Sequence, residues 1–246
     1  MLILALDTTG EAGGVSIFRD QECLACAMND GPANRYAVSL FYLLDRAIQE
    51  ARVKHGVLSG GLAEIGLIAV ATGPGSFPGI RVGLAAAKGW ARAFGMPVRG
   101  VAVLEALVEA AGAQPGWTMP VLDAHRGEFF VALFHRPANG ETGGQAALAA
   151  RHGWILKPAE MGHFMASRLP AGVETRCPVR ESDRAAMSLR ESLTGPPFQW
   201  QAVPGTLLQA VARLGLRDYR SGRDEAAGDL DALYIRRPDA ELLWKG

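Results

Sequence analysis

Cysteine is scarce in this chain, and neither sign of charge is in excess. Only three cysteines occur among 246 residues, which is too few for the disulfide framework of a small secreted domain. Lys and Arg together number 25, as do Asp and Glu. A neutral chain lacks the broad basic field of an autonomous nucleic-acid binder. If RNA is involved, we expect a partner to supply much of the positive charge.

The sequence also shows no pattern typical of a targeting segment or of a membrane-spanning segment. Met1 leads directly into the apolar run LILAL without a basic region before it, and no apolar run approaches the length of a membrane span. A hydrophobic content of 49% suffices for one or two domains with full cores. We therefore expect a cytoplasmic protein with no membrane partner.

Metal and thiol signatures are weak. The five histidines form neither H-x-x-x-H nor H-E-x-x-H, so no helical metal site is predicted. Cys23 and Cys26 form a C-x-x-C, but a zinc site needs a second pair and only Cys177 remains. Residues three apart in a strand point to opposite faces, which favours buried, small hydrophobic roles for Cys23 and Cys26. We predict no metal, no cofactor and no catalytic residue from these patterns.

The most informative stretch is residues 65–97. Residues 65–71 are apolar throughout, as expected of a strand buried on both faces. Residues 73–79 hold three glycines and two prolines, which indicates a fixed turn. A helix is predicted over 80–94, ending at Gly95 as a left-handed cap.

The turn before this helix resembles phosphate-binding loops without matching one. It is neither a P-loop, nor a dinucleotide fingerprint, nor a nucleophile elbow, because the required Lys, Gly and Ser spacings fail. Backbone N–H groups at the helix start, with Arg81 beside them, could hold an anion. A tight strand-to-helix turn with no ligand is the alternative, and the sequence leaves both open.

The predicted helix carries a stripe of small residues at four-residue spacing. The stripe consists of Gly79, Gly83, Ala87 and Ala91. A stripe without bulky side chains lets another backbone approach closely. A glycine such as Gly83 costs a helix about 1 kcal/mol relative to alanine, so close packing should compensate for it. That packing could involve a partner protein or the protein's own sheet.

The remaining pattern alternates strands and helices. Strands are predicted over 2–6, 15–18, 23–28, 98–101 and 154–156, and helices over 35–52, 104–111, 158–168 and 205–219. Residues 175–202 show poor periodicity and are left unassigned.

One hairpin pattern occurs twice. LILALDTTGEAGGVSIF near the start is echoed by MPVLDAHRGEFFVALF at 119–134, with Asp7 and Asp123 in equivalent places. The repeat suggests two related α/β halves, although hairpins are common enough for a chance match. Asp7, Thr8 and Thr9 offer a carboxylate and two hydroxyls to a phosphate or a metal-bound nucleotide. Such residues also cap turns with no ligand at all.

Five segments together resemble a known family. They are LALDTT, GPGSFPGIRVGLAAAKGWA, GVAVLEAL at 100–107, DAHRGEFFVALF at 123–134 and LYIRRP near the end. They resemble the TsaB (YeaZ) family, which serves bacterial synthesis of the threonylcarbamoyl modification on the tRNA adenosine next to the anticodon. The resemblance is good over residues 1–134 and thin from there to the last fifteen. Pro78 and Ile80 stand where family members usually carry Thr and Leu.

The resemblance implies a fold and a domain division. The fold is the α/β fold of the actin, sugar-kinase and Hsp70 superfamily (ASKHA), with two duplicated domains. We assign residues 1–103 to a partner-binding domain and 104–246 to a second domain, whose last helix is a candidate to pack back on the first.

The resemblance also implies a non-catalytic role. The related catalytic subunit, TsaD, carries a metal-binding H-x-x-x-H on a helix whose counterpart here, residues 34–39, has no histidine. The implied task is to bind and activate TsaD, together with the ATPase TsaE, and to reach tRNA only indirectly. The expected interface is the small-residue stripe with Phe41 and Leu44 of helix 35–52, and homodimers are expected when the partner is absent. The alternatives are an ATP-binding phosphotransferase holding phosphates at Asp7, Thr8 and Thr9, or a peptidase-like (glycoprotease-type) protein.

Overall fold

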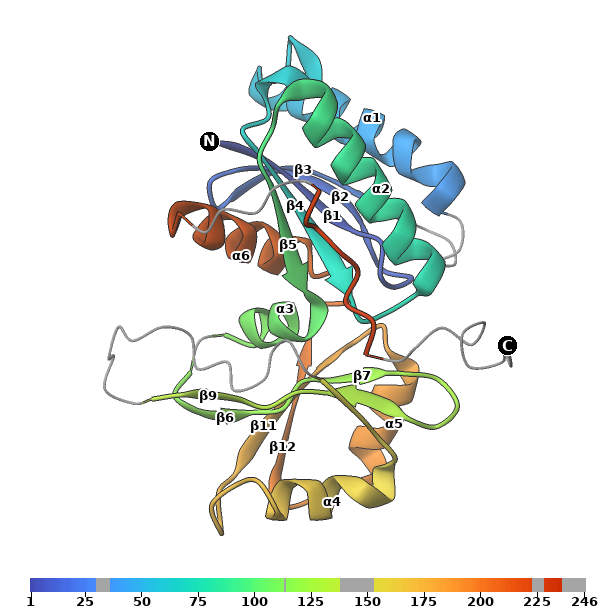
Figure 1. The fold of residues 1–246 in the computed structure, drawn as a ribbon, viewed down its shortest axis with the longest axis vertical. Coiled ribbons are helices and arrows are strands. Elements are labelled where there is room, and N and C mark those ends of the chain that lie inside the picture. Colours follow the sequence, from blue (N-terminus) through green and yellow to red (C-terminus); the bar gives the residue numbers. More distant parts are fainter. Residues whose placement is uncertain (30–35, 113, 138–152, 223–227, 236–246) are drawn as a thin grey trace. The chain divides into compact units, whose positions relative to one another are not determined.

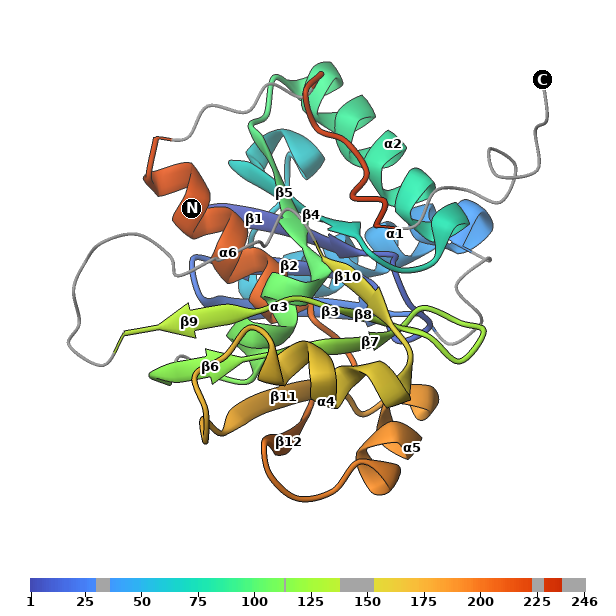
Figure 2. The same cartoon turned by 60° about the horizontal axis from the view of Figure 1, so that its bottom comes forward.

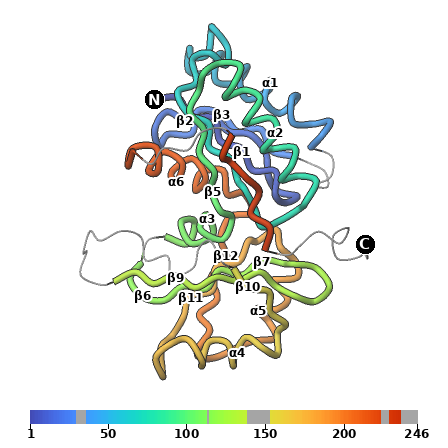
Figure 3. The backbone as a smooth tube through the Cα atoms, viewed as in Figure 1, coloured from blue at the N-terminus to red at the C-terminus, as the bar shows by residue number. Residues whose placement is uncertain are grey.

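The chain folds into two compact units. The computed structural model describes residues 1–29, 36–112, 114–137, 153–222 and 228–235. Unit 1 comprises Met1–Ala106 and Gly205–Ala232, and unit 2 comprises Leu107–Pro204 and Leu233–Gly246. The backbone trace in Figure 3 follows the chain out of unit 1 and back into it. Residues 205–232, assigned to the second domain from sequence, therefore belong to unit 1.

A mixed five-stranded sheet forms the centre of unit 1 (Figure 1). Its order is β3-β2-β1-β4-β5. The first three strands form an antiparallel meander, and β4 and β5 continue the sheet in parallel with β1. The strands are β1 Leu2–Asp7, β2 Gly14–Arg19, β3 Glu22–Met28, β4 Leu67–Gly73 and β5 Val98–Ala102. The predicted meander and the strand of residues 65–71 are thus confirmed, with ends shifted by one or two residues.

Helices cover both faces of this sheet. Two of them, α1 (Tyr36–His55) and α2 (Phe77–Phe94), lie on one face, and α6 (Leu208–Arg220) lies on the other (Figure 1). A short 3-10 helix, η2 (Gly61–Glu64), precedes β4. Because both faces are covered, β4 is buried along its whole length, as its continuous apolar sequence predicts.

The ends of α2 follow from its sequence. The Ser76 side chain accepts a hydrogen bond from the Gly79 N–H, and proline stands in the first turn, where it suits the start of a helix. Gly95 closes the helix with a φ of 67°, a left-handed conformation that glycine adopts without steric cost.

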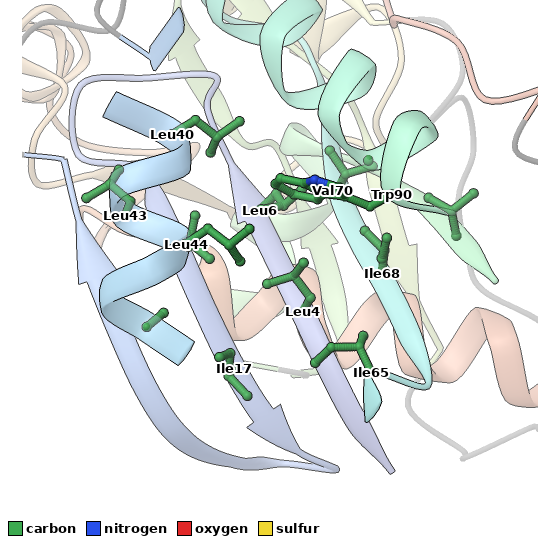
Figure 4. Packing of buried hydrophobic residues seen from close by; sticks show 14 of the residues in the cluster. Leu4, Leu6, Ile17, Leu40, Leu43, Leu44, Ile65, Ile68, Val70 and Trp90 are labelled. Carbon is green, nitrogen blue, oxygen red and sulfur yellow. The ribbon is translucent and has the colours of Figure 1, made fainter. Parts of the chain in front are cut away.

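The main core of unit 1 lies between the sheet and the α1–α2 pair. Figure 4 shows Leu40, Leu43 and Leu44 of α1 and Trp90 of α2 beside inward side chains of the sheet, among them Leu4, Leu6, Ile17, Ile68 and Val70. Successive residues of a strand point to opposite faces, so the alternate residues, such as Ala5 and Ala69, face α6. Gly215 of α6 packs so closely that a Cβ there would lie 2.5 Å from the Ala69 Cβ.

Unit 2 contains two smaller sheets (Figure 2). One has the order β10-β8-β7 and the other β12-β11-β6-β9. The strands are β6 Gly116–Thr118, β7 Val121–Asp123, β8 Phe129–Val131, β9 Phe134–Arg136, β10 Trp154–Leu156, β11 Thr175–Arg180 and β12 Phe198–Val203. The helices are α4 Pro158–Ala166 and α5 Arg184–Ser192, while α3 Val103–Ala110 contains the boundary between the units.

The prediction for residues 154–168 is confirmed, because a strand and a helix begin where the pattern placed them. Residues 175–202, which gave no clear periodicity, hold two strands and a helix. They are short elements, and β11 is almost entirely buried, so it shows no alternation of polar and apolar residues. Within the described residues, none of the helices has the length and apolar character needed to cross a membrane. Residue 35, where the helix 35–52 was predicted to begin, and the part of the LYIRRP segment from residue 236 on lie outside the described residues.

Candidate functional site

The turn after β1 brings together the three residues predicted to hold a phosphate. The Asp7 Oδ1 atom accepts hydrogen bonds from the Thr9 N–H at 3.0 Å and from the Thr9 hydroxyl at 2.6 Å. This is an Asx turn, in which a side chain stands in for a backbone acceptor. Asp7 and Thr8 are fully buried and Thr9 is 4% exposed, so the turn is an internal part of unit 1.

The N-terminus of α2 packs directly on this turn. The Thr8 hydroxyl donates to the Gly79 carbonyl at 2.7 Å, and the Ser76 N–H donates to the Thr9 carbonyl at 2.7 Å. A Cβ at Gly79 would lie within 3.0 Å of the Thr8 carbonyl oxygen, and a Cβ at Gly83 within 3.0 Å of the Thr8 Oγ1. Real Cβ atoms essentially never come that close, so a side chain at Gly79 would have to displace backbone and one at Gly83 would have to displace the Thr8 side chain.

These contacts explain the glycine-rich loop as a tight strand-to-helix turn, one of the two interpretations that the sequence left open. The polar groups of the turn serve the backbone of α2. A phosphate at Asp7, Thr8 and Thr9 would compete with the hydrogen bonds that these side chains make within unit 1. The capping role of these residues, the alternative to phosphate binding, therefore accounts for their geometry.

The small-residue stripe is also internal, which corrects its predicted place in a partner interface. Gly79, Gly83, Ala87 and Ala91 are all buried within unit 1. The stripe therefore has the second of its two proposed uses, packing on the protein's own sheet. Leu44 is 6% exposed and points into the same core (Figure 4).

The second hairpin repeats the turn of the first. Asp123 ends β7 as Asp7 ends β1, and its Oδ1 accepts the His125 N–H at 2.7 Å, the same two-residue spacing as in unit 1. Both hairpins are antiparallel. The predicted equivalence of Asp7 and Asp123 is therefore present in backbone geometry as well as in sequence. The second turn is open to solvent, with the exposed imidazole of His125 placing Nδ1 3.1 Å from Asp123 Oδ2.

A partly buried carboxylate supports the second turn. Asp183 caps α5 by accepting the Ala186 N–H at 2.9 Å, and its other oxygen accepts the Asp123 N–H at 2.8 Å. Burial raises the pKa of Asp183 above its ordinary value, and the neighbouring Asp123 charge acts in the same direction. The carboxylate thus joins α5 to β7 within unit 2.

An apolar patch is exposed on α1. It consists of Val38, Phe41 and Tyr42, which are 85%, 63% and 63% exposed. Their spacing of three and four residues places them on one face of the helix. The Phe41 ring meets the Trp90 ring of α2 edge to face, with centroids 5.9 Å apart. Of the residues predicted for a partner interface, Phe41 is therefore the one with a large exposed surface.

Cationic side chains accompany this α1 patch. The Arg46 guanidinium lies 5.7 Å from the centroid of the Tyr42 ring. Helix α2 carries Arg81, Lys88 and Arg92, and its sequence contains no acidic residue. The exposed sides of α1 and α2 therefore combine apolar rings with positive charge, to which α1 adds the exposed carboxylate of Asp45.

The two neighbouring cysteines differ from their prediction. Cys23 and Cys26 are both exposed, whereas Cys177 is buried. Within the part of the chain that the structure describes, no group of three or more His, Cys, Asp or Glu side chains is arranged to hold a metal ion. The reason for the exposure of both cysteines is an irregularity in β3, described below.

Comparison with known proteins agrees with the resemblance seen in the motifs. A model of the family described as "TsaD: tRNA N6-adenosine threonylcarbamoyltransferase" matches residues 33–150. The tRNA threonylcarbamoyladenosine biosynthesis protein TsaB of Escherichia coli (strain K12) is 31% identical over 168 residues, which are 64% of this chain and 63% of that protein. The protein of the same name from Bacillus subtilis (strain 168) is 28% identical over 137 residues, which are 54% of this chain and 55% of that protein.

The chain thus matches less than two thirds of the length of these curated relatives. Among solved structures, YeaZ from Pseudomonas aeruginosa superposes with a TM-score of 0.69 at 20% identity, covering 95% of this chain and 99% of that one. This likeness confirms the expected ASKHA-type fold. The named sequence relatives and this shared fold both support the resemblance to the TsaB/YeaZ family.

Proposed function

We propose that this protein is a non-catalytic subunit in the synthesis of N6-threonylcarbamoyladenosine in tRNA. The observation that carries the proposal is its similarity to two proteins named for that pathway. The engagement of Asp7, Thr8 and Thr9 by the N-terminus of α2 supports a role other than phosphate transfer. In this proposal the chain binds and activates a TsaD-type catalytic subunit, acts together with a TsaE-type ATPase, and reaches tRNA through that complex.

The surface we propose for the catalytic subunit is the α1 patch with the exposed side of α2. Exposed aromatic rings on adjacent helices provide a large apolar area with little conformational entropy to lose on binding. The cations of α2 favour a partner surface that carries carboxylates around an apolar centre. A second copy of this chain would bring its own α2 cations to the same place. A homodimer is therefore the weaker assembly, formed when the catalytic subunit is absent.

Co-purification tests this proposal. The protein is expressed with the TsaD-type subunit of its own organism, and the mass of the complex is measured by light scattering. Phe41→Asp places a charge in the centre of the α1 patch and should abolish the complex. Val53→Asp adds the same charge at a still more exposed position near the far end of α1, roughly 18 Å along the helix axis, and should leave the complex intact.

Val53→Asp should melt like the wild type, because its side chain is exposed, and Phe41→Asp should stay folded with a loss of about 0.5–1.5 kcal/mol from its edge contact with Trp90. A complex that tolerates Phe41→Asp would refute the α1 patch as the docking surface. The absence of any complex, with both proteins folded, would refute the partner role itself.

A further inference from the structure

A bulge in the edge strand β3 changes which way its side chains point. Phe18 of β2 pairs with Cys23, but the preceding residue, Ile17, pairs with Ala25, so Leu24 is one residue extra. Such a bulge interrupts the alternation of side chains along the strand. Leu24 and Ala25 are accordingly both buried, although they are adjacent in sequence.

The bulge places three sulfur atoms on one face of β3. On the neighbouring strand, Cys23 pairs with Phe18, Cys26 with Ser16 and Met28 with Gly14. These three partners are two residues apart, so they lie on one face of β2, and the side chains opposite them share that face. Without the extra residue, Cys23 and Cys26 would point to opposite faces, as the sequence pattern predicts.

Two of the three sulfur atoms are in contact, and both cysteines are exposed. The Cys26 Sγ lies 3.5 Å from the Met28 Sδ. The Cys23 thiol donates to the Ala25 carbonyl at 3.6 Å, and both cysteines are exposed. Burial of part of the Cys23 side chain raises the pKa of its thiol, and the charge of a Cys26 thiolate raises it further.

Strand geometry favours a bridging ion over a disulfide for this pair. A disulfide needs Cα atoms within about 7 Å of each other. In the bulged register Cys23 and Cys26 lie opposite Phe18 and Ser16, two residues apart on β2, which spaces them by about 7 Å, the upper limit for a disulfide. A metal ion that binds two sulfurs at about 2.3 Å each can hold them up to about 4.6 Å apart. That separation suits two side chains that are successive neighbours on one face of a strand.

We propose that Cys23, Cys26 and Met28 form a binding site for a soft monovalent metal ion, of which Cu(I) is the biological example. Thiolates and thioethers are the ligands that Cu(I) prefers. Binding breaks the two S–H bonds, releases two protons to solvent and forms two Cu–thiolate bonds, with the Met28 thioether as a third, neutral ligand. No electron is transferred. A structural Zn²⁺ ion asks for four nitrogen, sulfur or oxygen ligands, and this strand offers three sulfurs.

Titration of the whole reduced protein with Cu(I), without oxygen and in competition with the chelator bicinchoninate, tests the site. We expect one equivalent to be withdrawn from the chelator, with a new ultraviolet absorption from sulfur-to-copper charge transfer. Cys23→Ser and Cys26→Ser should each abolish the withdrawal, and Met28→Leu should weaken it. Cys177→Ser is the matched control, because that thiol is buried, and burial raises its pKa to about 12.

Two results would overturn the proposal. One is a wild-type protein that withdraws no Cu(I) from the chelator, and the other is a withdrawal that survives both Cys23→Ser and Cys26→Ser. Because both cysteines are exposed, the serine variants should keep the melting temperature of the wild type, which separates loss of the site from loss of the fold. The outcome is independent of the co-purification experiment, since Cys23 and Cys26 lie on β3 and not in the α1 patch.

Discussion

Two glycines of α2 offer a matched test of how the helix is seated on the first turn. Gly83 faces the Thr8 side chain, and a Cβ there would meet the Thr8 Oγ1 within 3.0 Å. Gly89 is exposed on the same helix, and a Cβ there would meet nothing within 4 Å. The substitution of either glycine by alanine removes the same backbone flexibility, so the difference between the two variants isolates the close contact.

The expected magnitudes follow from opposing effects. Alanine in place of glycine stabilises a helix interior by about 1 kcal/mol, which is the whole expected effect of Gly89→Ala. Overpacking at Gly83 costs about 1–3 kcal/mol. The displaced Thr8 hydroxyl also loses its bond to the Gly79 carbonyl, which costs about 1 kcal/mol more. Gly83→Ala should therefore be destabilising by about 1–3 kcal/mol after the gain in helix propensity is subtracted.

Chemical denaturation gives the free energies, and thermal melting gives a second measure, at about 2–4 °C per kcal/mol for a protein of this size. Thr8→Ala in the Gly83→Ala background should recover part of the loss, because it removes the atom that the new Cβ meets. The reasoning fails if Gly83→Ala is as stabilising as Gly89→Ala. The same contact means that a bulky residue at Gly83 should damage the fold of unit 1 rather than only a partner interface.

Two further outcomes are expected in the rest of the molecule. Because the folded-state pKa of Asp183 is raised, ionisation of this carboxyl opposes folding. The free energy of unfolding should therefore fall as the pH rises from about 3.8 through that raised pKa. Urea denaturation between pH 3 and 7 should show that Asp183→Asn lacks this fall, and an unchanged dependence on pH in the variant would contradict the reasoning. Gly215→Ala should lower the melting temperature of unit 1, since its Cβ would meet the Ala69 Cβ at 2.5 Å and push α6 off the sheet; a variant as stable as the wild type would show that α6 is free to shift.

Local chemistry determined much of the fold from sequence alone. The meander of β1, β2 and β3, the strand β4 and the end of α2 at Gly95 were predictable, because alternation, continuous apolar runs and glycine caps are properties of adjacent residues. The duplicated hairpin was likewise visible in the sequence, because an aspartate at the end of a strand can accept the N–H two residues on and so favours the same turn in both units. The short elements between residues 175 and 202 could not be predicted from sequence, because a buried strand without alternation of polar and apolar residues carries little local signal.

Only the tertiary structure decided which helix and strand faces are packed in the core and which are exposed to solvent. The spacing of the small-residue stripe on α2 shows that something packs closely there, but only the fold shows that this neighbour is Thr8 of the same unit. The apolar positions Phe41 and Leu44 look equivalent in sequence, yet one is exposed and the other is in the core. The bulge at Leu24 brings Cys23 and Cys26 to one face of β3, against the rule of alternation. In each case the deciding contact joins residues far apart in sequence or depends on strand register, and neither is encoded in the local pattern.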